Sequence, residues 1–398
     1  MKLREILIVI ICLSLIPISS TIIISNKAKA NMVSDTIKKF TSDDFEIYEA
    51  KLAETLNISI PVEEPIVEEV EPLDVPSKVD VVMNFVGDCT LGADSNFGYR
   101  NTFFEVFDLN NYSYFIENMQ SLFKNDDVTV ANLEGTFTDY MVKTPKKFNF
   151  RASPEYANII LSGDIEIVNI ANNHIRDYGQ KGYDDTVNTL NQYKTGFFGY
   201  DNYYIYEKDG VKIGFAGLTS IGDGTINKRI DNAVAYFNEN NCSGIVFTFH
   251  WGQERVYCQS QAQKNVAHYA IDKGADLVVG HHPHVVQGIE EYNGKYIVYS
   301  LSNFCFGGNT NPPDKDTFVF NITFSFEGGE STECKAVIYP ASVSSVKNRN
   351  DYKPTLAQGE EYIRIMNKIL KYSNVIVNES GEIIHQWGFR LFSWFSLI

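Results

Sequence analysis

From Val79 onward, the sequence alternates apolar runs typical of buried strands with capped helical segments. Strands are expected at 79–88, 127–135, 165–170, 211–218, 244–251, 275–280 and 295–304. Helices are expected at 153–163, 180–194 and 260–273, the first opened by the pair Ser153-Pro154. Because strands and helices alternate repeatedly, the sequence predicts an α/β fold with a largely parallel or mixed sheet covered by helices.

Polar side chains lie at or just past the carboxyl ends of five of these expected strands. They are Asp88; Asn132 and Glu134; Asn172, Asn173 and His174; His250; and His281, His282 and His284. The carboxyl ends of strands in an open α/β sheet border the crevice where ligands bind, so these side chains are expected to converge. A mixed set of carboxylate, amide and imidazole groups suits Zn, Mn or Fe. One such cluster alone is weak evidence, and repetition at five strand ends is what predicts a site.

Seven motifs occur in a fixed order: FVGDCTLG, ANLEGTFT, FRASPE, NIANNHIRDYG, HWGQE, VVGHHPHVVQ and YSLSNF. Together they resemble the signature of the CapA-type capsule-synthesis proteins, which are associated with poly-γ-glutamate production. The fold of that family is similar to calcineurin-like metallophosphoesterases. The resemblance runs from about Val79 to Pro340 and implies an α/β sandwich of mixed sheets flanked by helices.

The resemblance also implies roles for single residues. One or two divalent metal ions (Mn, Zn or Fe) are expected, with Glu134 in the place of a bridging carboxylate; the implied ligands are Asp88, Glu134, Asn173, His250, His282 and His284. In such enzymes the metal ions polarise a phosphoryl oxygen and activate water, while the His after the ligand Asn protonates the leaving group. This assigns proton donation to His174, held in position by Asp177.

Four further residues of the same motifs are expected to bind substrate: Asn132, Arg151, Glu254 and Asn303. His281 is expected to stay outside the metal ligands, because the family pattern keeps the His-Pro-His unit and tolerates other residues before it. Thr90 departs from the pattern of the phosphoesterases, which usually have His there, and this puts one of the two metal positions in doubt. Ser302 stands where the capsule family commonly has Gly.

Two functions of different class stay open. The first is an extracytoplasmic metal-dependent hydrolase or transferase that acts on a cell-surface polymer or a phosphate-containing precursor. The second is a non-catalytic subunit that binds the anionic polymer or its membrane synthase. A basic groove for such a polymer is offered by Lys143, Lys146, Lys147 and Arg151, and a solvated loop is the alternative. The net charge of −16 argues against a nucleic-acid partner.

The chain divides into four expected segments. Residues 1–30 combine Lys2 and Arg4, an apolar run and the sequence Ala28-Lys29-Ala30, so they are a cleaved signal peptide or an N-terminal membrane anchor. Either alternative places the body outside the cytoplasm. Residues 31–78 are an acidic Pro/Glu-rich stalk, residues 79–340 are the metallophosphoesterase-like domain, and residues 341–398 hold one helix at about 355–372 and an apolar tail.

Overall fold

The computed structural model describes residues 78–219 and 224–384 of the 398-residue chain. The expected signal segment, the stalk apart from Lys78, and the apolar tail after residue 384 lie outside the described residues. Within the described ranges, no helix has the length and apolar character needed to cross a membrane.

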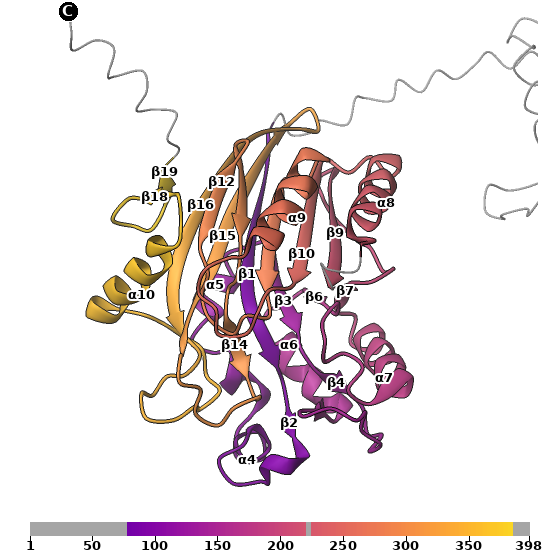
Figure 1. The fold of residues 1–398 in the computed structure, drawn as a ribbon, viewed down its shortest axis with the longest axis vertical. Helices are drawn as coiled ribbons and strands as arrows, with labels where there is room; N and C mark the ends of the chain where they lie inside the picture. The colour runs from indigo at the N-terminus through magenta and orange to yellow at the C-terminus, as the bar shows by residue number, and fades with distance from the viewer. Residues whose placement is uncertain (1–77, 220–223, 385–398) are drawn as a thin grey trace, which may run out of the picture. The chain divides into compact units, whose positions relative to one another are not determined.

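The first of two large sheets has eight strands in the order β17-β16-β15-β1-β3-β6-β7, with β14 beside β1 (Figure 1). Strand β1 is parallel to β3 and β14 and antiparallel to β15, so the sheet is mixed. Its strands are β1 (Val79–Thr90), β3 (Val128–Leu133), β6 (Ile167–Asn169), β7 (Gly196–Phe198), β14 (Asn303–Phe306), β15 (Asp316–Glu327), β16 (Glu330–Ser342) and β17 (Thr355–Leu356).

The second large sheet has six strands in the order β12-β13-β11-β10-β9-β8. Strands β9, β10, β11 and β13 are parallel, and an antiparallel strand lies at each edge. They are β8 (Tyr204–Lys208), β9 (Val211–Thr219), β10 (Gly244–His250), β11 (Leu277–His281), β12 (Ile289–Tyr292) and β13 (Lys295–Val298). Two small sheets are formed by β2 (Ala93–Asp94), β4 (Thr136–Phe137) and β5 (Phe150–Ala152), and by β18 (Ile376–Val377) and β19 (Ile383–Ile384).

A shared hydrophobic core joins the two large sheets. Alternate residues of β1, such as Met83 and Phe85, enter it from one sheet, and Ile213 and Phe215 of β9 enter it from the other. This period of two is what a strand imposes on its side chains. Each fully buried Val, Ile or Phe there stabilises the fold by roughly 1.5–3 kcal/mol.

Helices complete the layers on the outer faces of the sheets (Figure 1). One outer core packs α4 (Phe103–Leu109), α6 (Asn158–Ser162) and α7 (Gly179–Gln192) on the first sheet. The other packs α8 (Ile226–Glu239) and α9 (Gln261–Asp272) on the second sheet, and α10 (Gly359–Lys371) inserts apolar side chains beside the inter-sheet core. The predicted sandwich of mixed sheets flanked by helices is therefore confirmed.

The expected strand at 295–304 is wrong, because this run forms two strands in different sheets. Strand β13 belongs to the second sheet and β14 to the first. The chain changes sheet at Ser302, whose φ of 68° lies in the left-handed region. Its carbonyl accepts a hydrogen bond from Asp88 N (2.9 Å), and a Cβ on Gly87 would lie 2.1 Å from the same oxygen. Gly87 is therefore required for this close approach.

The backbone conformation of Ser302 suits the glycine that the family resemblance implies at this position, and it predicts a stabilising substitution. Ser302→Gly is expected to raise the free energy of unfolding by about 1 kcal/mol, because glycine adopts positive φ without steric cost. The Ser302 hydroxyl is also buried without a hydrogen-bond partner among the described residues, so its removal costs nothing. Urea unfolding measures the change.

Ser300→Gly is the matched control for this substitution. The Ser300 hydroxyl is buried and donates to the carbonyl of Val285 (2.8 Å), so its loss is expected to destabilise the protein. A destabilised Ser302→Gly variant would contradict the strain argument.

Candidate functional site

The polar clusters that follow the strands converge at one place, and they come from both large sheets. Asp88 lies in β1 and Glu134 follows β3 in the first sheet, whereas His250 ends β10 in the second. The ligand atoms of Glu134, His250 and His282 lie within 4.8 Å of one another, and so do those of Asp88, Glu134 and His284. Glu134 belongs to both groups, which is the position that a bridging carboxylate requires.

The expected amide ligand Asn173 lies against the first of these groups. Its Oδ1 is 2.7 Å from His250 Nε2, and His282 Nδ1 is 3.1 Å from the same nitrogen. Glu134 Oε1 is 3.4 Å from that nitrogen as well. Atoms of Asn173, His282 and Glu134, which come from three separate loops, thus surround His250 Nε2.

The His282-Pro283-His284 segment is held in an unusual backbone conformation. His282 has a φ of 96° and His284 a φ of 54°, both in the left-handed region that non-glycine residues rarely adopt. Such backbone strain costs of order 1–3 kcal/mol per residue and persists where surrounding contacts enforce it. Here Asp88 Oδ2 accepts a hydrogen bond from His282 N (3.3 Å), and the carbonyl of Pro283 accepts one from Arg255 N (2.7 Å).

His281 lies beside the ligand groups without belonging to either. It is buried at the end of β11, and its Nδ1 is 3.4 Å from Asp88 Oδ1. Asp88 therefore has imidazoles on more than one side, since His284 Nδ1 is 3.5 Å from its Oδ2. The position agrees with the expected role of His281 as a neighbour of the ligands, and that role stays a prediction.

Asn132 supports Asp88 from below the site. Its amide nitrogen donates to Asp88 Oδ1 (2.8 Å), and its oxygen accepts from Asn169 (2.8 Å) and Asn172 (3.3 Å). Asn132 is fully buried and does not line the cavity described below. It is therefore placed to position Asp88, and its expected contact with substrate gains no support. Asn169, the last residue of β6, was not predicted to belong to the site.

The charges at the site fit a divalent metal ion. Glu134 is fully buried, and neither of its carboxylate oxygens has a hydrogen-bond partner among the described residues. Burial, together with the carboxylates of Asp88, Asp177 and Glu254, raises the pKa of Glu134 well above its usual value. A buried carboxylate without donors is costly, and a cation between the two ligand groups would balance it.

The pKa shifts of Asp88 and His250 also fit a bound divalent metal ion. Burial alone raises the pKa of Asp88, but its contacts with three imidazoles outweigh burial and keep this pKa below its usual value. Burial lowers the pKa of His250 well below its ordinary value, so this imidazole is neutral, as metal ligation requires. The donor set of carboxylates, imidazoles and one amide oxygen suits Zn, Mn or Fe.

The expected proton donor His174 is hydrogen-bonded to its expected orienting residue. His174 Nδ1 lies 2.7 Å from Asp177 Oδ2, which also accepts a hydrogen bond from Phe150 N (2.5 Å). Burial lowers the pKa of His174, and the Asp177 carboxylate partly offsets this effect. The other oxygen of Asp177 forms an ion pair with Lys146, which also donates to the carbonyl of Asn173 (2.7 Å). The catalytic roles of His174 and Asp177 stay predictions.

Three of the four cations of the expected basic groove already have partners. Lys143 pairs with Asp94 (2.9 Å), Lys146 with Asp177, and the guanidinium of Arg151 donates to the carbonyl of Thr138 (2.6 Å). Lys147 lies over the ring of Phe148. Arg151 does not line the large cavity, so its position gives no support to the expected contact with substrate.

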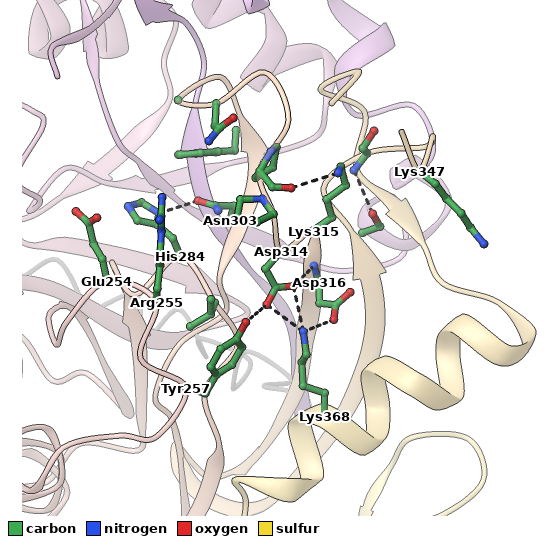
Figure 2. A pocket seen from close by; sticks show the side chains of 18 of the residues that line it. Glu254, Arg255, Tyr257, His284, Asn303, Asp314, Lys315, Asp316, Lys347 and Lys368 are labelled. Atoms are coloured by element: carbon green, nitrogen blue, oxygen red, sulfur yellow. Dashed lines mark hydrogen bonds and ion pairs between the residues drawn. The ribbon is translucent and has the colours of Figure 1, made fainter. Parts of the chain in front are cut away.

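A cavity of about 660 Å³ opens beside the ligand groups. His174, His284, Asn303, Glu254 and Arg255 line it, and Figure 2 shows the last four on one side of it, across from Lys347 and Lys368. Asn303 Oδ1 is 2.8 Å from His284 Nδ1. Glu254 and Asn303 therefore lie where a bound substrate could reach them, although their substrate-binding roles stay predictions.

A comparison with protein families decides to which group the chain belongs. The sequence model of the bacterial capsule synthesis protein family PGA_cap matches residues 82–308, which is more than half of the chain. The chain belongs to this family. The matched residues include every expected metal ligand and His174, and the suspected resemblance to CapA-type proteins is confirmed.

Curated relatives of this PGA_cap protein carry names from capsule and polyglutamate synthesis. It is 26% identical over 268 residues to the capsule biosynthesis protein CapA of Bacillus anthracis, covering 60% of this chain and 63% of that protein. It is 29% identical over 211 residues to the PGA biosynthesis protein CapA of Bacillus subtilis (strain 168), covering 47% and 55%. A Mycobacterium tuberculosis protein named "Probable polyglutamine synthesis accessory protein" is 28% identical over 208 residues, covering 44% and 55%. The chain thus aligns with between half and two thirds of the length of these relatives.

Metal content distinguishes the ligand histidines from their neighbour. His282→Ala and His284→Ala are each expected to lower the metal bound per chain sharply, because each removes one member of a three-ligand group. His281→Ala is the matched control, since it leaves both groups intact, and it is expected to retain most of the metal. Metal stoichiometry and thermal stability of the three variants beside the parent measure the effect. Equal metal content in all of them, or greater loss in His281→Ala, would contradict the assignment.

Proposed function

We propose that this protein is a metal-dependent hydrolase or transferase of capsule or polyglutamate biosynthesis that acts on an anionic cell-surface polymer or a phosphate-containing precursor of it. Family membership and the names of the relatives support the biosynthetic part. The observation that carries the catalytic part is Glu134, a buried carboxylate without hydrogen-bond donors that is shared by two ligand groups beside a cavity of about 660 Å³.

The chemistry divides between the bound metal and the protein. A divalent metal ion held by these ligands supplies Lewis-acid activation of the attacked group and of water. His174 lines the cavity, and because Asp177 engages its Nδ1, Nε2 is the nitrogen left to transfer a proton to the leaving group; the donor is the doubly protonated ring, which the Asp177 carboxylate stabilises. Asp177 and Lys146 fix the orientation of the imidazole.

We place this activity outside the cytoplasm. The support is the sequence of residues 1–30, with its positive start, apolar run and Ala28-Lys29-Ala30 site. The Pro/Glu-rich stalk at 31–78 would then separate the domain from the membrane surface. The same placement would bring the domain within reach of a membrane polymer synthase.

A second candidate function is a non-catalytic subunit that binds the anionic polymer or its membrane synthase. Two observations favour it: a relative is named an accessory protein of polyglutamine synthesis, and Thr90 replaces the usual histidine of the phosphoesterases. Turnover by the purified protein separates the two candidates.

The catalytic proposal predicts a specific loss of rate. The full-length chain, loaded with Mn²⁺, Zn²⁺ or Fe²⁺, is expected to cleave a phosphodiester or a γ-linked glutamate polymer in a hydrolysis screen. His174→Asn is expected to lower kcat by about 10²–10⁴-fold with unchanged metal content, because it removes the proton donor and spares the ligands. The readouts are product release and metal per chain.

His268→Asn is the matched control for a histidine outside the site. His268 lies on α9, where it contacts Glu290 (2.9 Å) and stacks on Tyr292, and it does not line the cavity. It is expected to retain the parent rate. An unchanged rate in His174→Asn would remove His174 from the mechanism, and absence of turnover in the metal-loaded parent would favour the non-catalytic subunit.

A further inference from the structure

The cavity beside the ligand groups is built from two parts of the chain. Its first half comes from residues within the family match, including Phe150, His284 and Phe306. Its second half comes from residues beyond position 308, in the loop before β15, the loop after β16, and helix α10. The cavity therefore extends from the expected metal site to α10, and a ligand that fills it must be longer than the group that reaches the metals.

The walls of this cavity carry more cations than expected for so acidic a chain. Five cations and four carboxylates line it, although the whole chain has a net charge of −16. Three of the cations already have partners: Lys315 donates to Asn311 (2.7 Å), Arg364 forms two hydrogen bonds with Asp316 (2.7 and 2.6 Å), and Lys368 pairs with Asp314 (3.0 Å).

The side chains of the remaining two cations, Arg255 and Lys347, differ from these. Within residues 78–219 and 224–384 we find no hydrogen-bond or ion-pair partner for either side chain. Figure 2 shows them on opposite sides of the cavity, with Arg255 beside the His284 side and Lys347 at the far side. An anion entering the cavity would therefore meet Arg255 without displacing an existing partner, whereas the Lys347 amine points outward and lies at the outer rim (Figure 2).

Arg255 is tied to the expected metal ligands through its backbone. Its N–H donates to the carbonyl of Pro283 (2.7 Å), which lies between His282 and His284. Its φ of 62° is in the left-handed region, so the surrounding contacts hold this residue in a strained conformation. Strain of this kind is found at ligand-binding positions, and here it fixes the start of a guanidinium side chain next to the site.

We propose that Arg255 binds an anionic group of the substrate, a carboxylate or a phosphate, and thereby determines which bond of an elongated anionic substrate lies against the metal ligands. A guanidinium forms two parallel hydrogen bonds with either group, which gives orientation as well as affinity. Lys347 offers a second contact to a longer ligand. That this ligand is a substrate rests on the proposed function, but its binding by Arg255 does not require turnover.

Binding to the full-length, metal-loaded protein tests this inference with two probes, a γ-linked glutamate tetramer and inorganic phosphate. Titration calorimetry is expected to show that Arg255→Gln raises the dissociation constant of at least one probe by about tenfold or more, because a charge-assisted bidentate contact is lost. Arg255→Lys is expected to lose less, since it keeps the charge without the paired hydrogen bonds. Lys347→Gln is expected to weaken binding of the tetramer and to leave the affinity for phosphate unchanged.

Arg100→Gln is the matched control, because Arg100 is an exposed arginine that does not line the cavity. It is expected to bind both probes as the parent does, and metal content is expected to be equal in all variants. The probe whose affinity falls in Arg255→Gln identifies the group as carboxylate or phosphate. Unchanged binding of both probes by Arg255→Gln, or no saturable binding of either probe by the parent, would overturn the inference. A parent that binds through Arg255 without turnover would contradict the hydrolase and leave this inference standing.

Discussion

Two buried carboxylates, Asp88 and Glu134, impose the constraint on which the rest of the site depends. Removing a charged carboxylate from water costs several kcal/mol, so its surroundings must offset that cost. Asp88 accepts a hydrogen bond from the amide of Asn132 and lies beside imidazoles, whereas neither oxygen of Glu134 has a hydrogen-bond partner among the described residues. This cost explains the strained backbone at His282 and His284, because it brings their imidazoles next to the two carboxylates, whose negative charge a bound cation would balance.

Much of the fold was predictable because strands and helices leave different hydrophobic periods in a sequence. The run 127–135, for example, contains β3, and the helix expected at 260–273 is α9 with its Ser260 capping box. The run 295–304 was wrongly predicted as one strand because β13 and β14 are both apolar and are separated by only a few residues. The positive φ at Ser302 that directs them into different sheets leaves no signal in the residue type. Helix α8 was not predicted.

The site was predictable where chemistry depends on position along a strand, and it was not where chemistry depends on the direction of a side chain. Asp88 and His250 stand out because each lies at the end of an apolar run. Arg151 lies in a family motif as well, but its guanidinium turns to the carbonyl of Thr138. Lys146 belongs to a short basic run in the sequence, yet its side chain forms an ion pair with the buried Asp177. The far wall of the cavity comes from residues 309–368, whose sequence carries no motif and which only the fold brings beside His284.

The central claim is that Glu134 is shared by two groups of metal ligands. Crystals of the protein grown with Mn²⁺ and measured at the manganese absorption edge test it most directly. Anomalous density is expected within about 2.2 Å of a Glu134 oxygen, toward His250 and His282 on one side and toward Asp88 and His284 on the other. Anomalous density that avoids Glu134, or no density at these residues at saturating Mn²⁺, would contradict the account.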